Sequence, residues 1–210
     1  MEGHIGVDES GKGDYFGPLV VAGCYVGPEH LAELDGVMDS KKLTDAKATM
    51  LAAAIRAVCP HSILTIMPTR YNELYAEIQN LNRLLEWGHV KVITEVHKLY
   101  PCAHALSDQF ADPRRLKAKL AAKNLDITLE TRVRAEEDIA VAAASILARA
   151  EFLRRLKELS RQFEIELPKG ATVVKDKGVQ FVRKYGAERL GEVAKLHFKT
   201  TAQVRAMAAR

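Results

Sequence analysis

Residues 6–23 read Gly-Val-Asp-Glu-Ser-Gly-Lys-Gly-Asp-Tyr-Phe-Gly-Pro-Leu-Val-Val-Ala-Gly, and no other stretch indicates so much about the protein. Asp8 and Glu9 follow a short apolar run, and a glycine-rich turn comes directly after them. Neighbouring carboxylates repel each other, so a stable fold rarely keeps them together without a cation or strong hydrogen-bond donors. Glycines let a backbone approach a bulky ligand, and Lys12 can meet phosphate. The stretch therefore indicates metal-assisted chemistry on a phosphodiester.

Two other interpretations of this stretch are open. Gly6, Gly11 and Lys12 satisfy most of the P-loop pattern, but Gly13 stands where that motif has the Ser or Thr that holds magnesium. The two acids would also lie inside the loop and repel a triphosphate. A tight hairpin with solvated acids is the default for a single Asp-Glu pair, but it does not explain the related motifs downstream.

The length and composition favour one globular α/β protein. The chain has 210 residues, of which 48% are hydrophobic and 6% aromatic, and its formal net charge is +4. We expect a single domain over 1–210 whose C-terminal region, roughly 164–210, is helical. The sequence shows neither a secretory signal nor an apolar run of membrane-spanning length, so we expect a cytoplasmic protein without a membrane partner. Its three scattered cysteines fit that reducing compartment.

The hydrophobic pattern predicts a mixed central sheet flanked by helices. Strands are expected over 4–8, 17–26, 62–67, 103–107 and 127–130, and helices over 44–58, 80–99, 113–123, 139–163, 177–185 and 188–195. The face of the helix over 80–99 includes Leu81, Leu84, Leu85 and Leu99. Residues 142–145 have almost no side-chain bulk, which allows this helix to approach the sheet closely.

Four acids stand at positions that such a fold holds rigidly. Asp8 and Glu9 end one predicted strand, Asp108 ends another, and Glu136 precedes the alanine-rich helix. Two-metal phosphodiester cleavage needs several carboxylates that converge on cations about 4 Å apart. Acids also predominate in residues 1–112 and bases in residues 113–210, as suits a protein that binds metal and phosphate.

The fourth acid has competitors. Glu137 and Asp138 crowd the same turn as Glu136, and acids at a helix start also interact favourably with the helix dipole. Asp112 competes with Asp108, although the following Pro113 indicates an ordinary turn.

These motifs resemble the type 2 ribonucleases H. Residues 6–23 are similar to the first signature of that family, and Lys12 between two glycines resembles ribonuclease HIII, because ribonuclease HII usually has arginine there. Asp108 before Gln-Phe resembles the family's next acid. Glu136 ahead of Ala-Ala-Ser-Ile-Leu-Ala resembles its last, which is Glu in ribonuclease HIII and Asp in HII. The segments 39–43, 80–82, 87–89 and 195–201 are also similar, so the resemblance covers residues 4–201.

The resemblance implies an enzyme with the RNase H-like fold. Such an enzyme cleaves the RNA strand of RNA–DNA hybrids endonucleolytically and leaves 3′-hydroxyl and 5′-phosphate ends. It implies Mg²⁺ or Mn²⁺ as cofactor, with two ions during catalysis. Apart from the resemblance, we expect a monomer. Asp8, Glu9, Asp108 and Glu136 would be both the catalytic residues and the metal ligands.

The resemblance also implies a substrate-binding set. The turn formed by Ser10, Gly11, Lys12 and Gly13 would contact the RNA strand and sense its 2′-hydroxyl groups. Further candidates for contact with the hybrid are the cations and one histidine at Lys41, Lys42, Lys195, His197 and Lys199. His89 and His197 each fit a functional or a structural role.

The chain departs from the family pattern in two respects. Ribonuclease HIII normally begins with an additional substrate-binding domain, whereas here the first motif starts at residue 6; a lineage without that domain and a truncated chain are both open. The segment 168–172 lacks the tyrosine with which ribonuclease HII recognises an RNA–DNA junction. The missing tyrosine argues against efficient excision of single ribonucleotides. Two alternatives stay open: a ribonuclease HII-like enzyme that incises at single embedded ribonucleotides, and a hybrid-binding protein without catalysis.

Overall fold

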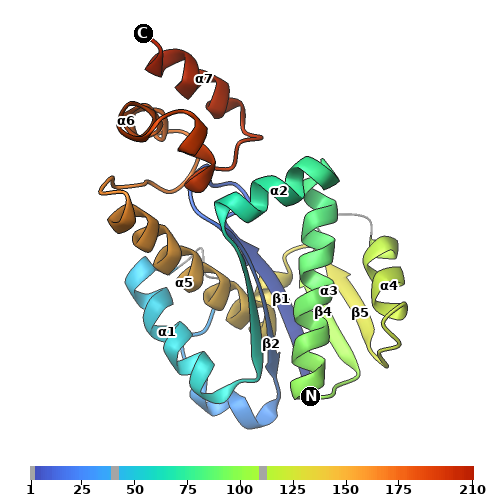
Figure 1. Ribbon diagram of the computed structural model, residues 1–210. Coiled ribbons are helices and arrows are strands. Elements are labelled where there is room, and N and C mark those ends of the chain that lie inside the picture. Colours follow the sequence, from blue (N-terminus) through green and yellow to red (C-terminus); the bar gives the residue numbers. More distant parts are fainter. Residues whose placement is uncertain (1–2, 39–42, 109–112) are drawn as a thin grey trace. The chain divides into compact units, whose positions relative to one another are not determined.

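A five-stranded mixed sheet organises the computed structural model, which describes residues 3–38, 43–108 and 113–210 (Figure 1). The strand order is β3-β2-β1-β4-β5. The strands are β1 (His4–Ser10), β2 (Leu19–Val26), β3 (His61–Ile66), β4 (His104–Asp108) and β5 (Thr128–Arg132). Strand β1 pairs antiparallel with β2 and parallel with β4, and β4 pairs parallel with β5. The predicted mixed sheet is confirmed.

Helices occupy most of the remaining described residues. They are η1 (Pro28–Glu33), α1 (Asp45–Val58), α2 (Pro68–Ile78), α3 (Leu81–Leu99), α4 (Pro113–Ala121), η3 (Ala135–Glu137), α5 (Ile139–Gln162), α6 (Lys175–Tyr185), η4 (Glu188–Glu192) and α7 (Lys199–Ala208). Thr44 caps α1 as expected, because its side chain accepts a hydrogen bond from the Lys47 amide. No helix within these parts of the chain has the length and apolar character that crossing a lipid bilayer requires.

The elements differ from the expected ones at several places. Strand β1 continues to Ser10 instead of ending at Asp8. Helix α2 was not predicted, and α7 lies in the C-terminal region that was expected to be helical, without bounds of its own. Pro68 stands in the first turn of α2, where its fixed φ angle favours helix and its missing N–H costs nothing. Leu99 is 66% exposed because it is the last residue of α3 and projects beyond the core that Leu84 and Leu85 enter.

The chain divides into two compact units, each described here by itself. Unit 1 comprises residues 1–10, 20–64 and 81–150, and unit 2 comprises residues 11–19, 65–80 and 151–210. The expected acids all belong to unit 1, and the glycine-rich turn from residue 11 onward belongs to unit 2. That residues 1–210 form one catalytic domain stays a prediction.

In unit 1 the first turn of α5 lies directly on β1. A Cβ atom on Gly6 would overlap the backbone of Ala140 and Val141, so only glycine fits there. Both of those helix residues are fully buried. The close approach that the alanine-rich stretch allows is therefore present.

Helix α3 covers the opposite face of the sheet in unit 1 (Figure 1). A Cβ atom on Gly23 would lie 3.3 Å from side-chain carbons of Val92 and Val96 of α3. Gly23 pairs with Val7 in the antiparallel ladder, and paired residues point to the same face. Because side chains alternate along a strand, Gly6 faces α5 while Val7 faces α3.

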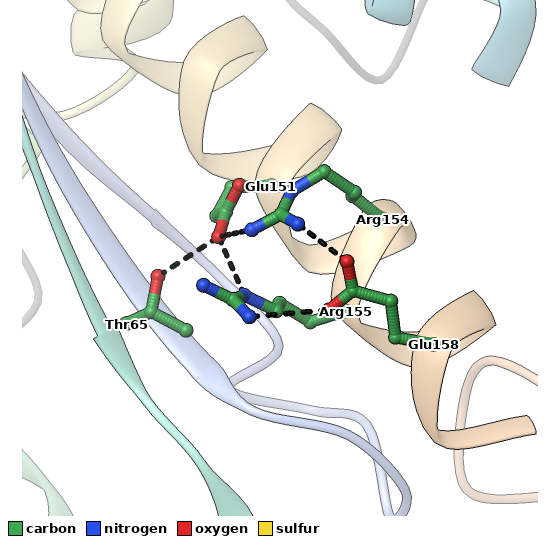
Figure 2. Close-up of polar contacts among 5 residues, drawn as sticks. All are labelled: Thr65, Glu151, Arg154, Arg155 and Glu158. Atoms are coloured by element: carbon green, nitrogen blue, oxygen red, sulfur yellow. Dashed lines mark hydrogen bonds and ion pairs between the residues drawn. The ribbon is translucent and has the colours of Figure 1, made fainter. Parts of the chain in front are cut away.

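A charged network anchors the second half of α5 in unit 2 (Figure 2). Glu151 is only 6% exposed, and its carboxylate accepts hydrogen bonds from Thr65, Arg154 and Arg155. The two guanidinium groups also bind Glu158. Burial raises the pKa of Glu151, but the hydrogen bonds and charges of both arginines outweigh this and lower the pKa to about 2.

We expect Glu151→Gln to lower the free energy of unfolding by about 2 kcal/mol at pH 7. This loss is smaller than that for breaking a fully buried ion pair, because both arginines are partly exposed to solvent. A lowered pKa stabilises the fold above the ordinary value of 4.5, and this contribution disappears as the pH falls towards about 2. The difference between the wild type and the variant should therefore shrink in acid. Chemical unfolding at pH 7 and pH 3 measures it.

A matched control removes an exposed acid with a similar partner. Glu164 lies on the surface of unit 2 and pairs with Lys184, so Glu164→Gln should leave stability unchanged at both pH values. Equal destabilisation by Glu151→Gln at pH 7 and pH 3 would contradict the electrostatic account and indicate a packing effect.

Candidate active site

The predicted acids lie at one edge of the sheet in unit 1. Strands β1, β4 and β5 run parallel, so their carboxyl ends meet at the same edge. Asp8 and Glu9 stand near the end of β1, Asp108 ends β4, and Glu136 lies in the short helix η3 that follows β5. All four are partly exposed. That these four acids form one metal site stays a prediction.

Asp8 and Asp108 are neighbours across the sheet. Val7 pairs with Ser107 in the parallel ladder, so the next residue on each strand, Asp8 and Asp108, also lie side by side. They share the face on which Gly6 contacts α5. Two carboxylates on adjacent strands and one face are suited to hold a common cation.

Asp8 and Glu9 point to opposite faces of the sheet, because side chains alternate along a strand. Glu9 lies on the α3 face, where its carboxylate is 3.2 Å from Nε2 of His89. Strand geometry thus relieves the repulsion that was expected between the neighbouring acids. The two carboxylates that share one face of the sheet are therefore Asp8 and Asp108, and not Asp8 and Glu9.

A hydrogen bond joins the end of β4 to the turn that carries Glu136. The Ala135 amide donates to Oδ1 of Asp108 over 3.5 Å. Arg134 adopts a left-handed conformation with φ 58°, which starts the short helix η3 at that point. The Glu9 amide likewise donates to Oδ1 of Asp8 over 2.8 Å. The backbone therefore helps to orient two of the acids.

The hydrogen bonds of Asp138 indicate a structural role for this residue. Its Oδ1 accepts hydrogen bonds from the amides of Ala140 and Val141 at the start of α5 and lies 2.9 Å from Nε2 of His4. Burial raises the pKa of Asp138, but the His4 hydrogen bond and charge, with the two amides, hold it below its ordinary value. Asp138 is the N-cap of α5, which favours Glu136 as the site acid.

The donor chemistry of the edge fits a hard divalent cation. Carboxylate oxygens are the ligands that Mg²⁺ and Mn²⁺ prefer. Among the described residues, no three His, Cys, Asp or Glu side chains are placed to hold a metal ion together. Mg²⁺ commonly takes one or two protein carboxylates and completes its shell with water and substrate phosphate.

The glycine-rich turn is built within unit 2. Gly11 has φ 88°, and a Cβ atom there would overlap the Pro18 carbonyl oxygen. Gly13 is exposed, and a Cβ atom there would meet nothing within 4 Å. The fold therefore requires glycine at position 11 but not at position 13. At position 13 the lack of a side chain leaves room for a ligand. Lys12 between them is partly exposed.

Lys195 takes a different place from the expected phosphate contact. Its side chain is fully buried, and its ammonium donates 2.8 Å hydrogen bonds to the carbonyl oxygens of Asp14 and Gly17. It also lies 5.7 Å from the centre of the Tyr71 ring. Burial lowers the pKa of Lys195 to about 7, although the Asp14 carboxylate acts in the opposite direction. Lys195 therefore braces the chain just after the glycine-rich turn, and phosphate cannot reach it from solvent.

The remaining predicted contacts differ in how far the structure describes them. The His197 ring stacks on Tyr75 with centroids 4.3 Å apart, and burial, followed by the charge of Lys195, lowers the pKa of His197. Lys199 is exposed at the start of α7. Lys41 and Lys42 lie outside the described residues.

The mixed sheet with acids at its parallel edge defines an α/β enzyme of the RNase H-like class. A family model described as ribonuclease HII matches residues 5–201. The chain belongs to the ribonuclease HII family. The predicted family, fold class and enzyme class are thereby confirmed.

Relatives and solved structures agree. The chain is similar to ribonuclease HIII of Protochlamydia amoebophila, with 46% identity over 94% of this chain and 66% of the relative. Ribonuclease HIII of Chlamydia pneumoniae is 46% identical over 93% of this chain and 68% of the relative. The chain thus spans about two thirds of these relatives. The structure of Bst-RNase HIII in complex with Mn²⁺ matches with a TM-score of 0.91 and 33% identity, covering 99% of this chain and 70% of that one.

Proposed function

We propose that this chain is an endoribonuclease that cleaves the RNA strand of RNA–DNA hybrids by metal-dependent hydrolysis. The convergence of Asp8 and Asp108 at the parallel edge of the sheet, in a chain of this family, carries the proposal. The products would have 3′-hydroxyl and 5′-phosphate ends. The similar Bst-RNase HIII in complex with Mn²⁺ supports a divalent cofactor, Mg²⁺ or Mn²⁺.

Each acid has a part in this chemistry. Asp8 and Asp108 would hold a cation on the α5 face, and Glu136, on the turn after β5, would be a further ligand. Glu9 would take part from the same end of β1, although its side chain lies on the α3 face. A pair of bound ions would activate the attacking water and stabilise the leaving 3′-oxygen. The carboxylates also give this edge a negative charge, which repels a polyanion such as nucleic acid. A protein that only bound the hybrid would bind it more tightly without these acids, so their presence favours catalysis.

The turn after β1 would recognise the RNA strand. Ser10, Gly11, Lys12 and Gly13 are proposed as that contact, because the open space at Gly13 allows close approach to a ribose. The 2′-hydroxyl is the group that distinguishes RNA from DNA. Lys199, His197, Lys41 and Lys42 remain proposed contacts to the hybrid. Lys195 would act through the shape of the turn.

We further infer a monomer that works in the cytoplasm. The free thiols of Cys24, Cys59 and Cys102 suit a reducing compartment. Sedimentation of the purified chain with and without hybrid measures the oligomeric state, and a dimer in both would contradict this part of the proposal.

A cleavage assay tests the activity. A continuous RNA–DNA hybrid and a DNA duplex with one embedded ribonucleotide are incubated with the chain in Mg²⁺, in Mn²⁺ and in EDTA. We expect metal-dependent cleavage of the continuous hybrid. Preferential incision at the single ribonucleotide would establish the ribonuclease HII-like alternative instead, and hybrid binding without cleavage in either metal would establish a binding protein.

A further inference from the structure

A buried histidine connects two of the strands that carry the acids. His89 of α3 is 0% exposed. Its Nε2 lies 3.2 Å from Oε2 of Glu9 on β1, and its Nδ1 lies 3.0 Å from Oγ of Ser107 on β4. Ser107 immediately precedes Asp108. All of these residues belong to unit 1.

The direction of the hydrogen bond between His89 and Glu9 follows from the groups involved. The Glu9 carboxylate can only accept, so the hydrogen must be on Nε2 of His89. Nδ1 lies 3.0 Å from the Ser107 hydroxyl, which also donates to the carbonyl oxygen of Asp108 over 3.1 Å. Both ring nitrogens of His89 thus have a hydrogen-bond partner, which fixes the orientation of the ring. The Glu9 carboxylate accepts a hydrogen bond from a donor whose position is fixed.

Packing alone does not require this arrangement. The neighbours of His89 on α3 include the buried Val90 and Val92, and an apolar residue would fill the position without burying polar atoms. A buried imidazole is costly unless its nitrogens are hydrogen-bonded, and here both bonds go to side chains at the acidic edge. The polar group is thus placed where it acts on Glu9.

We propose that His89 is a positioning residue that fixes the Glu9 carboxylate for metal binding, with Ser107 holding the imidazole. The proposal rests on the proposed function, since Glu9 must be a metal ligand. Groups that orient metal ligands from behind typically change metal affinity or activity by about 10- to 100-fold when removed. His89 does not itself touch substrate or metal.

Two variants separate positioning from a purely structural role. His89→Gln can place an amide N–H near the position of Nε2, so it retains a donor for Glu9. His89→Asn has a shorter side chain, which can reach Ser107 but not Glu9. We expect Mn²⁺ affinity, measured by isothermal titration calorimetry on the metal-free chain, to fall about 10- to 100-fold in His89→Asn and clearly less in His89→Gln. Thermal melts followed by circular dichroism verify that both variants are folded at the temperature used.

The kinetic readout has the same logic. With a continuous hybrid, kcat should fall in His89→Asn while KM for the hybrid changes little, because His89 orients an acid and does not contact nucleic acid. Higher Mn²⁺ concentration should restore part of the loss. Both variants having wild-type Mn²⁺ affinity and kcat, with only a lower melting temperature, would overturn the proposal.

A double-mutant cycle tests whether the effect passes through Glu9. If it does, His89→Asn should have little further effect on Mn²⁺ affinity in a Glu9→Gln background. Additive losses would overturn the proposed route. Failure of the parent proposal is distinguishable: a wild-type chain that cleaves no hybrid contradicts the activity, while the calorimetric cycle still reports whether His89 acts on a metal site through Glu9.

Discussion

Asp8→Asn and Asp108→Asn are each expected to lower kcat on a continuous RNA–DNA hybrid by about a thousandfold, or about 4 kcal/mol of transition-state free energy. Each change removes one negative charge from a pair of carboxylates on adjacent strands and one face of the sheet. The cation that this pair would hold then loses an anionic ligand. The fold should survive, because removing one of two neighbouring charges relieves repulsion in the metal-free state.

Single-turnover rates in Mg²⁺ and circular dichroism melts measure the two parts of this expectation. Glu137→Gln is the matched control, since Glu137 is exposed and lies in the same turn as Glu136; it should keep wild-type rates. Glu136→Gln should lose turnover, whereas Asp138→Asn should chiefly lower the melting temperature through the cap of α5. The reverse pattern in these last two variants would show that Asp138 is the fourth site acid.

Gly6→Ala is expected to destabilise the protein by more than about 4 kcal/mol, a size that marks an unaccommodated clash in a core. The added methyl group would overlap the backbone of Ala140 and Val141, and neither a rotamer change nor a small shift removes a clash with backbone. Strand β1 and the start of α5 would have to separate. Because β1 also carries Asp8, activity should be lost with the fold.

Urea unfolding and the soluble yield on expression measure this loss. Gly13→Ala is the control for stability, because a methyl group at that position meets nothing within 4 Å. It should unfold at the wild-type urea concentration whatever it does to hybrid binding. A Gly6→Ala protein with wild-type stability would mean that β1 and α5 are not in the close contact described.

The positions of Asp8, Glu9 and Asp108 near strand ends could be predicted from the sequence because their signals are local. Asp8 and Glu9 border a glycine-rich turn, and Asp108 ends an apolar run, so both positions are recognisable without any tertiary contact. The mixed sheet followed from similar patterns. Even the opposite orientations of Asp8 and Glu9 follow from the two-residue period of a strand, once β1 is seen to continue to Ser10.

The remaining features depend on partners far away in the chain. Lys195 reads as an ordinary surface lysine, and only its contact with the carbonyl oxygens of Asp14 and Gly17 shows that it is buried. Asp138 is identified as a cap by the amides of α5 together with His4, which lies 134 positions earlier. Local patterns contain no information on such pairings, so the sequence alone left these roles open.

The interleaved order of the two units limits how parts of this chain can be exchanged. Each unit is assembled from three separate stretches, so no single cut isolates either one. A chimeric protein that joins residues 1–150 of this chain to the C-terminal part of a relative would replace only the last stretch of unit 2. Residues 11–19 and 65–80 of unit 2 would still come from this chain. The replacement must then still supply Gly170, whose amide binds Asp14 and whose carbonyl accepts from Tyr15, and a lysine at position 195. A chimera with a relative should therefore fold only when the loop after β1 and the C-terminal segment that contacts it come from compatible sequences.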